Sequence, residues 1–256
     1  MGNPLHFSLE VPRRAHQLLR DLYEQLGDSE GTGLPLKATF LLSVSMPIMI
    51  LPIERILKYR RDPAHVHMND AVLHPKLAEA VDRAIDLHAA VHLADFFTGP
   101  WQFASVDKGV GFPNLAAEGL PEDIAVQLDA PAAIEDARNL SANLFCKILR
   151  NALAHGGILY LDEHGRSSST APVRRFAFVS TNSPYNPTKL LILRLGMAEY
   201  RAFLQKWVDW LKSEAIDEIL ANDVGLDATV ASVEISEKEE ALSNGNAARG
   251  ERSADS

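Results

Sequence analysis

Three residues near the middle of the chain have types and a spacing that suit the cleavage of a phosphodiester. Arg150 and Asn151 are neighbours, and His155 follows four residues after Asn151. In a helix, residues four apart lie on one face, so Asn151 and His155 would share a face that the long side chain of Arg150 can reach. A guanidinium binds a phosphate through paired hydrogen bonds, and an imidazole transfers protons near neutral pH. Together these groups offer charge stabilisation and acid–base catalysis without a metal.

The same stretch also has a purely structural interpretation. A histidine in the last turn and a glycine directly after it are ordinary signals for the end of a helix, and Gly156 and Gly157 follow His155 here. The loose spacing of an arginine and a later histidine recurs in three other places: Arg60 with His65, Arg61 with His67, and Arg83 with His88. The stretch 150–155 differs from these by Asn151, by two alanines on the open face and by the glycine stop.

Composition limits the class of protein. The chain has 256 residues, 46% of them hydrophobic, which is enough for one sizeable core. Its net charge is −9, which excludes a basic nucleic-acid coat and requires any RNA contact to be local. The single cysteine, Cys146, excludes an internal disulfide framework and fits a reducing compartment. Its apolar neighbours predict a buried thiol.

Two segments bear on localisation. Residues 1–10 have no basic stretch followed by an apolar one, so we expect no signal peptide. The most apolar run, residues 39–53, contains Pro47 and Pro52 and is shorter than the roughly 20 residues that a membrane span needs. We therefore expect a bent core helix, no membrane contact and a cytoplasmic protein.

Hydrophobic periodicity predicts a mainly all-α fold. Five segments have helical spacing: residues 11–26, 35–59, 75–97, 133–154 and 197–220. Residues 98–132 hold four glycines and four prolines and predict an irregular insertion, with a short helix near 121–128. The period changes to two around a polar turn and predicts a β-hairpin over residues 158–180. The expected architecture is a helical bundle with a hairpin before its last helix, in one domain over residues 1–230, and a disordered acidic tail over residues 231–256.

The stretch from Leu149 to Gly157, with Arg150, Asn151 and His155, resembles the signature of the HEPN superfamily. That signature is an arginine, a polar residue that is very often asparagine, and a histidine late in a helix of an α-helical bundle. The order of helices, hairpin and last helix is similar to that of a plasmid-borne bacterial branch of the superfamily.

The resemblance implies a metal-independent endoribonuclease that cleaves RNA by attack of the 2′-hydroxyl. It also implies a homodimer whose two motifs meet in a shared cleft, a role as a toxin or phage-defence effector, and an antitoxin partner. Arg150 and His155 would then be catalytic and Asn151 would orient them, with RNA rather than DNA as the substrate. The alternative is a catalytically inactive HEPN-like dimer that serves as a binding or regulatory module.

Two other groups of residues, one basic and one of histidines, have types that suit a binding or metal site. Arg174, Arg175 and Lys189 lie around the hairpin and could guide RNA phosphates, although charges on a hairpin also deter edge-to-edge pairing. His88 and His92 are four apart, but a zincin motif would need glutamate at position 89, which is alanine. A second pair lies at positions 65 and 67, and two such pairs can form a metal site. His88 and His92 are on the apolar stripe of their predicted helix, however, which favours semi-buried histidines over a metal site. We expect no metal and no cofactor, since residues 109–111 also lack the rest of a phosphate-binding loop.

Overall fold

The computed structural model describes residues 7–26, 36–58, 70, 75–86, 88–109, 111–182 and 188–212. The predicted domain boundary at residue 230 and the predicted tail over residues 231–256 lie outside these residues, as do His65 and His67. The last helix, α9 (Met197–Leu211), begins where the sequence predicts and is described to its end at Leu211.

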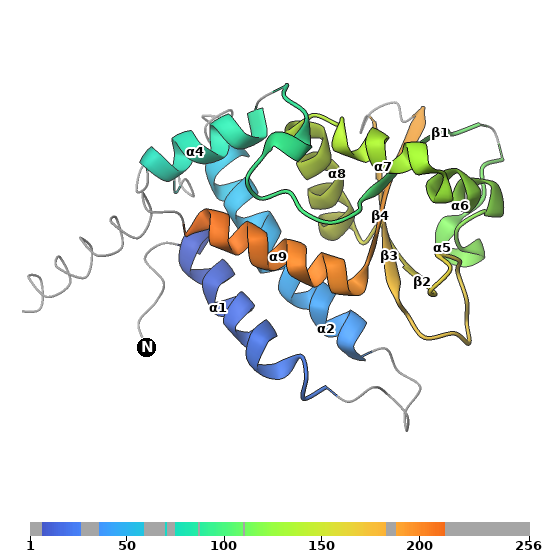
Figure 1. Ribbon diagram of the computed structural model, residues 1–256, viewed down its shortest axis with the longest axis horizontal. Helices are drawn as coiled ribbons and strands as arrows, with labels where there is room; N and C mark the ends of the chain where they lie inside the picture. Colours follow the sequence, from blue (N-terminus) through green and yellow to red (C-terminus); the bar gives the residue numbers. More distant parts are fainter. Residues whose placement is uncertain are drawn as a thin grey trace, which may run out of the picture. The chain divides into compact units, whose positions relative to one another are not determined.

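A four-stranded antiparallel sheet lies at the centre of the described residues (Figure 1). Its strands are β1 (Gln102–Asp107), β2 (Ile158–Leu161), β3 (Arg175–Thr181) and β4 (Lys189–Gly196), in the spatial order β1-β4-β3-β2. The expected hairpin is present as β2 and β3. The prediction of a mainly all-α bundle is nevertheless wrong, because β4 and β1 extend this hairpin into a sheet on which the helices pack. The fold is mixed α/β.

Burial on both faces of the sheet explains why β4 was not predicted. All residues from Leu190 to Leu195 are buried and all of them except Arg194 are apolar, so this strand lacks the alternation of a half-exposed strand. β1 lies inside residues 98–132, which the sequence marks as irregular. Its backbone is paired with β4 along its whole length, from Gln102 opposite Arg194 to Asp107 opposite Lys189.

Helices cover both faces of the sheet (Figure 1). On one face, Phe176 and Phe178 of β3 pack against Tyr200 of α9. This aromatic core also contains Trp101, Phe145 and Phe203. α8 (Ala142–His155) contributes Phe145 and lies against β3. Offset and edge-to-face ring contacts of this kind add to the stabilisation that comes from burying the rings.

The opposite face of the sheet is covered by α6 (Glu122–Asp129), with α5 (Leu115–Glu118) beside it (Figure 1). Ala177 and Ile192 point to this side and join one hydrophobic cluster with Ile124 of α6. Successive strand residues point to opposite faces, so β3 sends Ala177 to α6 and Phe178 to α9. The sheet is therefore a central layer between two sets of helices.

A fully buried arginine in β4 is neutralised on the α6 side. Arg194 donates hydrogen bonds to Asp129 at the end of α6 and to Gln102 on β1. Arg166, from the loop between β2 and β3, binds the same carboxylate through Nη1 at 2.9 Å. Although burial raises the pKa of Asp129, hydrogen bonds from Arg194 and Arg166 hold it below its usual value. The charges form a network that ties the sheet to α6.

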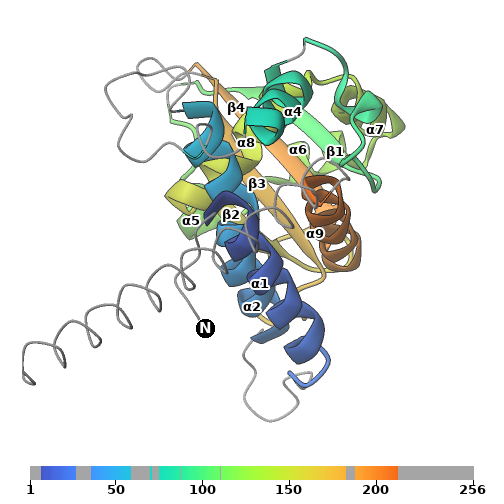
Figure 2. The ribbon, with the colours of Figure 1, turned by 90° about the vertical axis from the view of Figure 1, so that its left-hand side faces the viewer.

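The apolar segment of residues 35–59 forms a long helix, as predicted. The helix extends beyond the most apolar run, residues 39–53, at both ends. α2 (Leu36–Ser45) passes into the wider π-helical turns η1 (Met46–Ile50) and η2 (Ile53–Lys58) next to Pro47 and Pro52. Residues 36–56 make the one helix among the described residues that is long and apolar enough to cross a membrane, a test that core helices also pass. It lies beside α1 (Phe7–Leu22) in both views (Figure 2) and contacts α1, α8 and α9.

Two predicted helices are shorter than their periodicity suggests. α4 (Pro75–Asp86) ends before position 88, and the chain continues as a single 3-10 turn, η5 (Val91–Leu93). The segment 133–154 is broken between α7 (Pro131–Arg138) and α8, because Ser141 starts a new helix with its hydroxyl accepting a hydrogen bond from the Leu144 amide. A backbone bridge between Ala90 and Ser141 joins the two interruptions.

Candidate active site

The Arg150–His155 stretch forms the last turns of α8, as the sequence predicts. Gly156 ends the helix in the left-handed conformation, with φ of 70°, and its amide donates to the Ala152 carbonyl. Gly157 is required for a different reason. A β-carbon at this position would overlap the Val179 carbonyl oxygen of β3. The glycine pair therefore turns the chain and lets the end of α8 lie directly against β3, where Val179 donates to the Gly157 carbonyl at 2.7 Å.

Arg150 is held in place by two acceptors. Its Nε and Nη2 atoms pair with the carboxylate of Glu54 in η2, which lies 96 residues earlier in the chain. Its Nη1 atom donates to Oδ1 of Asn151 at 2.9 Å. The Arg150 side chain is 29% exposed and that of Glu54 is 21% exposed, so the ion pair is partly shielded from water. The guanidinium is therefore oriented and neutralised at once.

Asn151 links this pair to the sheet. While its Oδ1 accepts from Arg150, its Nδ2 donates to the hydroxyl of Ser180 at 3.2 Å. Ser180 is buried in β3. Four side chains, Glu54, Arg150, Asn151 and Ser180, thus form one chain of polar contacts across η2, α8 and β3. We call it the polar chain below.

His155 stands apart from the polar chain. It is the last residue of α8 and its side chain is exposed. It makes no hydrogen bond or ion pair with any other residue that the structure describes. The last turn of a helix carries the negative end of the helix dipole. Because its side chain is exposed, the imidazole is accessible to a substrate. It lies one turn beyond Asn151 on the same face of the helix.

The residues predicted to bind RNA divide between the two ends of the sheet. Lys189 lies at the start of β4, two residues from Leu191, the register partner of Ser180. It is half-exposed and pairs with Asp107 at 3.7 Å. This end of the sheet is the one at which α8 terminates.

Arg174 and Arg175 lie at the opposite end of β3. Arg175 and Ser180 are five positions apart, which is about 17 Å at the rise of a strand. The two arginines line a separate cavity of about 340 Å³ with Glu163 and Glu199, and the Arg175 Nε donates to the Glu163 carbonyl at 3.0 Å. The structure does not bring the two arginines together with the polar chain.

The histidines weighed as metal ligands do not share a helix, because α4 ends at Asp86. His88 is exposed, and His92 lies 2.9 Å from the Arg138 carbonyl through Nδ1. Within the described ranges, no three His, Cys, Asp or Glu side chains are grouped to hold a metal ion. The prediction of a buried Cys146 is confirmed, and burial raises the pKa of its thiol.

Two members of the polar chain were not predicted as site residues. Glu54 reaches Arg150 only through the packing of η2 on α8, and no local spacing signals a contact over 96 residues. Ser180 lies in a segment rich in hydroxyl and amide groups, but its approach to Asn151 depends on how β3 packs beneath α8. Comparison with protein-family models, curated proteins and solved structures gives no significant match.

Proposed function

We propose that the end of α8 is the active site of a metal-independent endoribonuclease of the HEPN type that acts in the cytoplasm. The observation that supports this most is the pairing of a fixed arginine with an exposed histidine on one helix end. Arg150 is oriented by Glu54 and Asn151, whereas His155 is accessible. Preorganised charge and a free acid–base group are what phosphodiester cleavage requires.

In this proposal the RNA supplies its own nucleophile. The imidazole of His155 accepts the proton of the 2′-hydroxyl, and the 2′-oxygen attacks the adjacent phosphorus. The bond between phosphorus and the 5′-oxygen breaks, and the leaving oxygen takes a proton from a second imidazolium. The products are a 2′,3′-cyclic phosphate and a 5′-hydroxyl. Arg150 stabilises the charge that develops on the phosphoryl oxygens, and Asn151 is a positioning residue for Arg150.

The second imidazolium implies a homodimer in which two α8 ends meet. Mixing the wild type with an inactive His155→Ala protein, under conditions that exchange subunits, tests this arrangement. If each cleft needs two histidines, activity falls as the square of the wild-type fraction, since only wild-type pairs are competent. A linear fall would show that one subunit carries a complete site, and a monomeric mass in light scattering would exclude the shared cleft.

A second candidate function is a binding or regulatory module without catalysis, such as the partner of an antitoxin. The Arg150–Glu54 ion pair favours it, because a guanidinium already bound to a carboxylate has less capacity for a phosphate. The two functions differ in a simple way. A binding module retains RNA or protein affinity in the His155→Ala variant and produces no cleavage in the wild type.

The cleavage chemistry can be tested on a defined RNA oligonucleotide. We expect cleavage in EDTA, with a 2′,3′-cyclic phosphate on the upstream product by mass spectrometry. A matched oligonucleotide with one 2′-deoxynucleotide at the cleaved position should resist at that position only. Cleavage of the deoxy-substituted bond, or 5′-phosphate products, would show that water and not the 2′-hydroxyl is the nucleophile and would contradict the proposal.

A further inference from the structure

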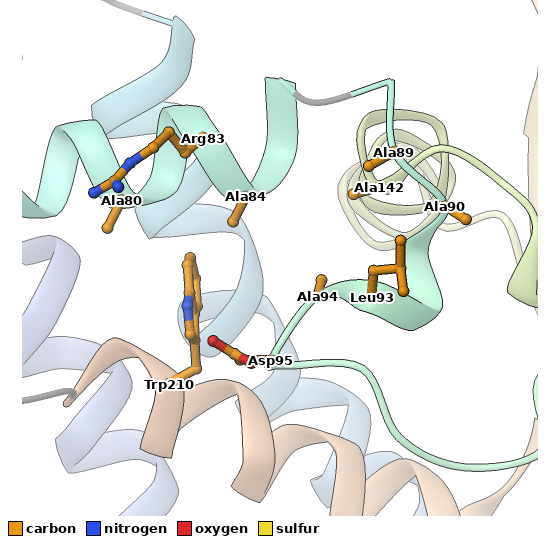
Figure 3. Close-up of a pocket in the computed structure, with 10 residues that line it drawn as sticks. All are labelled: Ala80, Arg83, Ala84, Ala89, Ala90, Leu93, Ala94, Asp95, Ala142 and Trp210. Atoms are coloured by element: carbon orange, nitrogen blue, oxygen red, sulfur yellow. The ribbon is translucent and has the colours of Figure 1, made fainter.

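A cavity of about 320 Å³ lies between α4, η5 and α9, next to the start of α8 (Figure 3). It includes Ala142, the first residue of α8, whereas Arg150 is eight residues further along that helix, about 12 Å at the rise of an α-helix. Six of its ten lining residues are alanines, and the other four are Arg83, Leu93, Asp95 and Trp210. Its volume falls within the range of small-molecule sites.

Trp210 gives this cavity a fixed aromatic surface. The other two tryptophans, Trp101 and Trp207, are fully buried, whereas Trp210 is partly exposed and lines the cavity. Its ring is held by Phe96 at 5.3 Å and by Trp207 at 5.1 Å between ring centroids. A ring that is fixed on one side and open on the other can stack a planar ligand at little entropic cost.

Two opposite charges flank that ring. In the close-up, Trp210 stands between the guanidinium of Arg83 and the carboxylate of Asp95 (Figure 3). Neither charge forms an ion pair with any residue in the described part of the chain. Arg83 makes one long hydrogen bond, from Nε to the Glu79 carbonyl at 3.4 Å. Both groups are therefore available to a ligand that carries an anion on one side and N–H donors on the other.

From these three side chains we infer that the cavity binds a guanine nucleotide. The base stacks on Trp210, the phosphate pairs with Arg83, and the carboxylate of Asp95 accepts hydrogen bonds from the base. Guanine is the nucleobase with two adjacent N–H donors on its Watson–Crick edge, and a carboxylate accepts both. Adenine and cytosine place an acceptor nitrogen beside their amino group, so this nitrogen would face the carboxylate oxygens and repel them. The nucleotide can be a free mononucleotide or the 5′ end of an RNA chain.

The binding test uses the full chain and guanosine monophosphate in EDTA, with tryptophan fluorescence as the readout. Trp101 and Trp207 are buried, so we expect quenching on ligand addition to come mainly from Trp210, and Trp210→Phe should abolish it. Affinity measured by calorimetry should fall about tenfold in Asp95→Asn, since a charged acceptor is lost. The exposed Asp136→Asn in α7 is the matched control and should leave affinity unchanged. Adenosine monophosphate should bind about tenfold more weakly than guanosine monophosphate.

Further measurements distinguish a free nucleotide from an RNA 5′ end as the ligand, and they test the contact between Arg83 and the phosphate. Guanosine without phosphate should bind more weakly than the monophosphate, and Arg83→Gln should remove that difference. An RNA with a 5′-phosphorylated guanosine that binds far more tightly than the free nucleotide identifies an RNA end as the ligand. Absence of quenching by both ligands would overturn the inference. The inference would also be overturned if the adenine and guanine nucleotides bound with equal affinity and Asp95→Asn changed neither affinity. Because the readout is equilibrium binding, none of these results depends on RNA cleavage.

Discussion

Arg150 of α8 and Glu54 of η2 form an ion pair that joins two helices 96 residues apart in the sequence. The pair fixes the direction of the guanidinium, and Asn151 holds its third nitrogen. The candidate site thus depends on the long π-turned helix as well as on the motif in α8.

Replacing Glu54 with glutamine should separate the orienting role of this ion pair from substrate binding. The amide keeps one acceptor but loses the charge, so Arg150 becomes less well fixed at the transition state. We expect kcat for RNA cleavage to fall about tenfold with little change in KM. Steady-state kinetics on one RNA substrate is the measurement, and a wild-type kcat in Glu54→Gln would show that the pair is only structural.

Removing the Ser180 hydroxyl should weaken both stability and activity. In Ser180→Ala the Nδ2 group of Asn151 loses its acceptor, and an unsatisfied polar group in a partly buried place costs about 1 kcal/mol. We expect that loss in the free energy of unfolding by urea titration, together with a several-fold fall in kcat. Ser105→Ala, at an exposed position of β1, is the matched control and should change neither quantity.

The two glycines after His155 should differ in their tolerance of a methyl group. Gly156 has open space at its β-position and needs only the left-handed backbone, so Gly156→Ala should cost about 1 kcal/mol of stability. Gly157→Ala must displace the Val179 carbonyl, a backbone atom of β3, and should cost more. Urea unfolding of the two variants gives the comparison. The reverse order would mean that α8 does not lie against β3 as described.

Stability should depend on pH through Asp70. This carboxylate is buried and accepts hydrogen bonds from Arg55 and from the Ser8 amide. Burial raises its pKa, but those bonds together hold the pKa below its ordinary value. A depressed folded pKa contributes stability above the unfolded value of about 4, and that contribution is lost as pH falls through the folded pKa.

The Asp70→Asn variant tests this pH dependence. At pH 7 it should be less stable than the wild type by about 2 kcal/mol, because hydrogen bonds to a charged acceptor are lost. The difference should shrink as pH falls below about 4, where the carboxyl is protonated first in the unfolded wild type and then, at the lower folded pKa, in the folded wild type. Thermal or urea unfolding from pH 3 to pH 7 measures it. A difference independent of pH would show that Asp70 is not charged in the folded protein.

The parts of the fold that sequence predicts are those with a clear local period. The helix over Ala142–His155 and the strands of the hairpin have one face buried and one face exposed or half-exposed. β4 has no such pattern, since α6 covers one of its faces and α8 and α9 cover the other. The break before Ser141 was also missed, because Ala133 and Ala137 continue the apolar period across two separate helices.

The candidate site was predictable to the same extent. Arg150, Asn151 and His155 are close in sequence, so helical geometry alone places them together. The partners that orient them, Glu54 and Ser180, are brought in by tertiary packing of η2 and β3. Arg175 was assigned to RNA binding only because it is positively charged. In the structure it lies at the start of β3, at the opposite end of the strand from Ser180.

The most direct test of the proposed function is RNA cleavage in EDTA by the wild type and by His155→Ala. His164→Ala serves as the matched control, since this exposed histidine lies in the loop between β2 and β3. We predict that the wild type and His164→Ala cleave at the same rate and that His155→Ala, folded by circular dichroism, loses at least 100-fold in rate. Equal cleavage by His155→Ala and the wild type, or no cleavage by any of the three proteins, would contradict the assignment of the α8 end as a ribonuclease site.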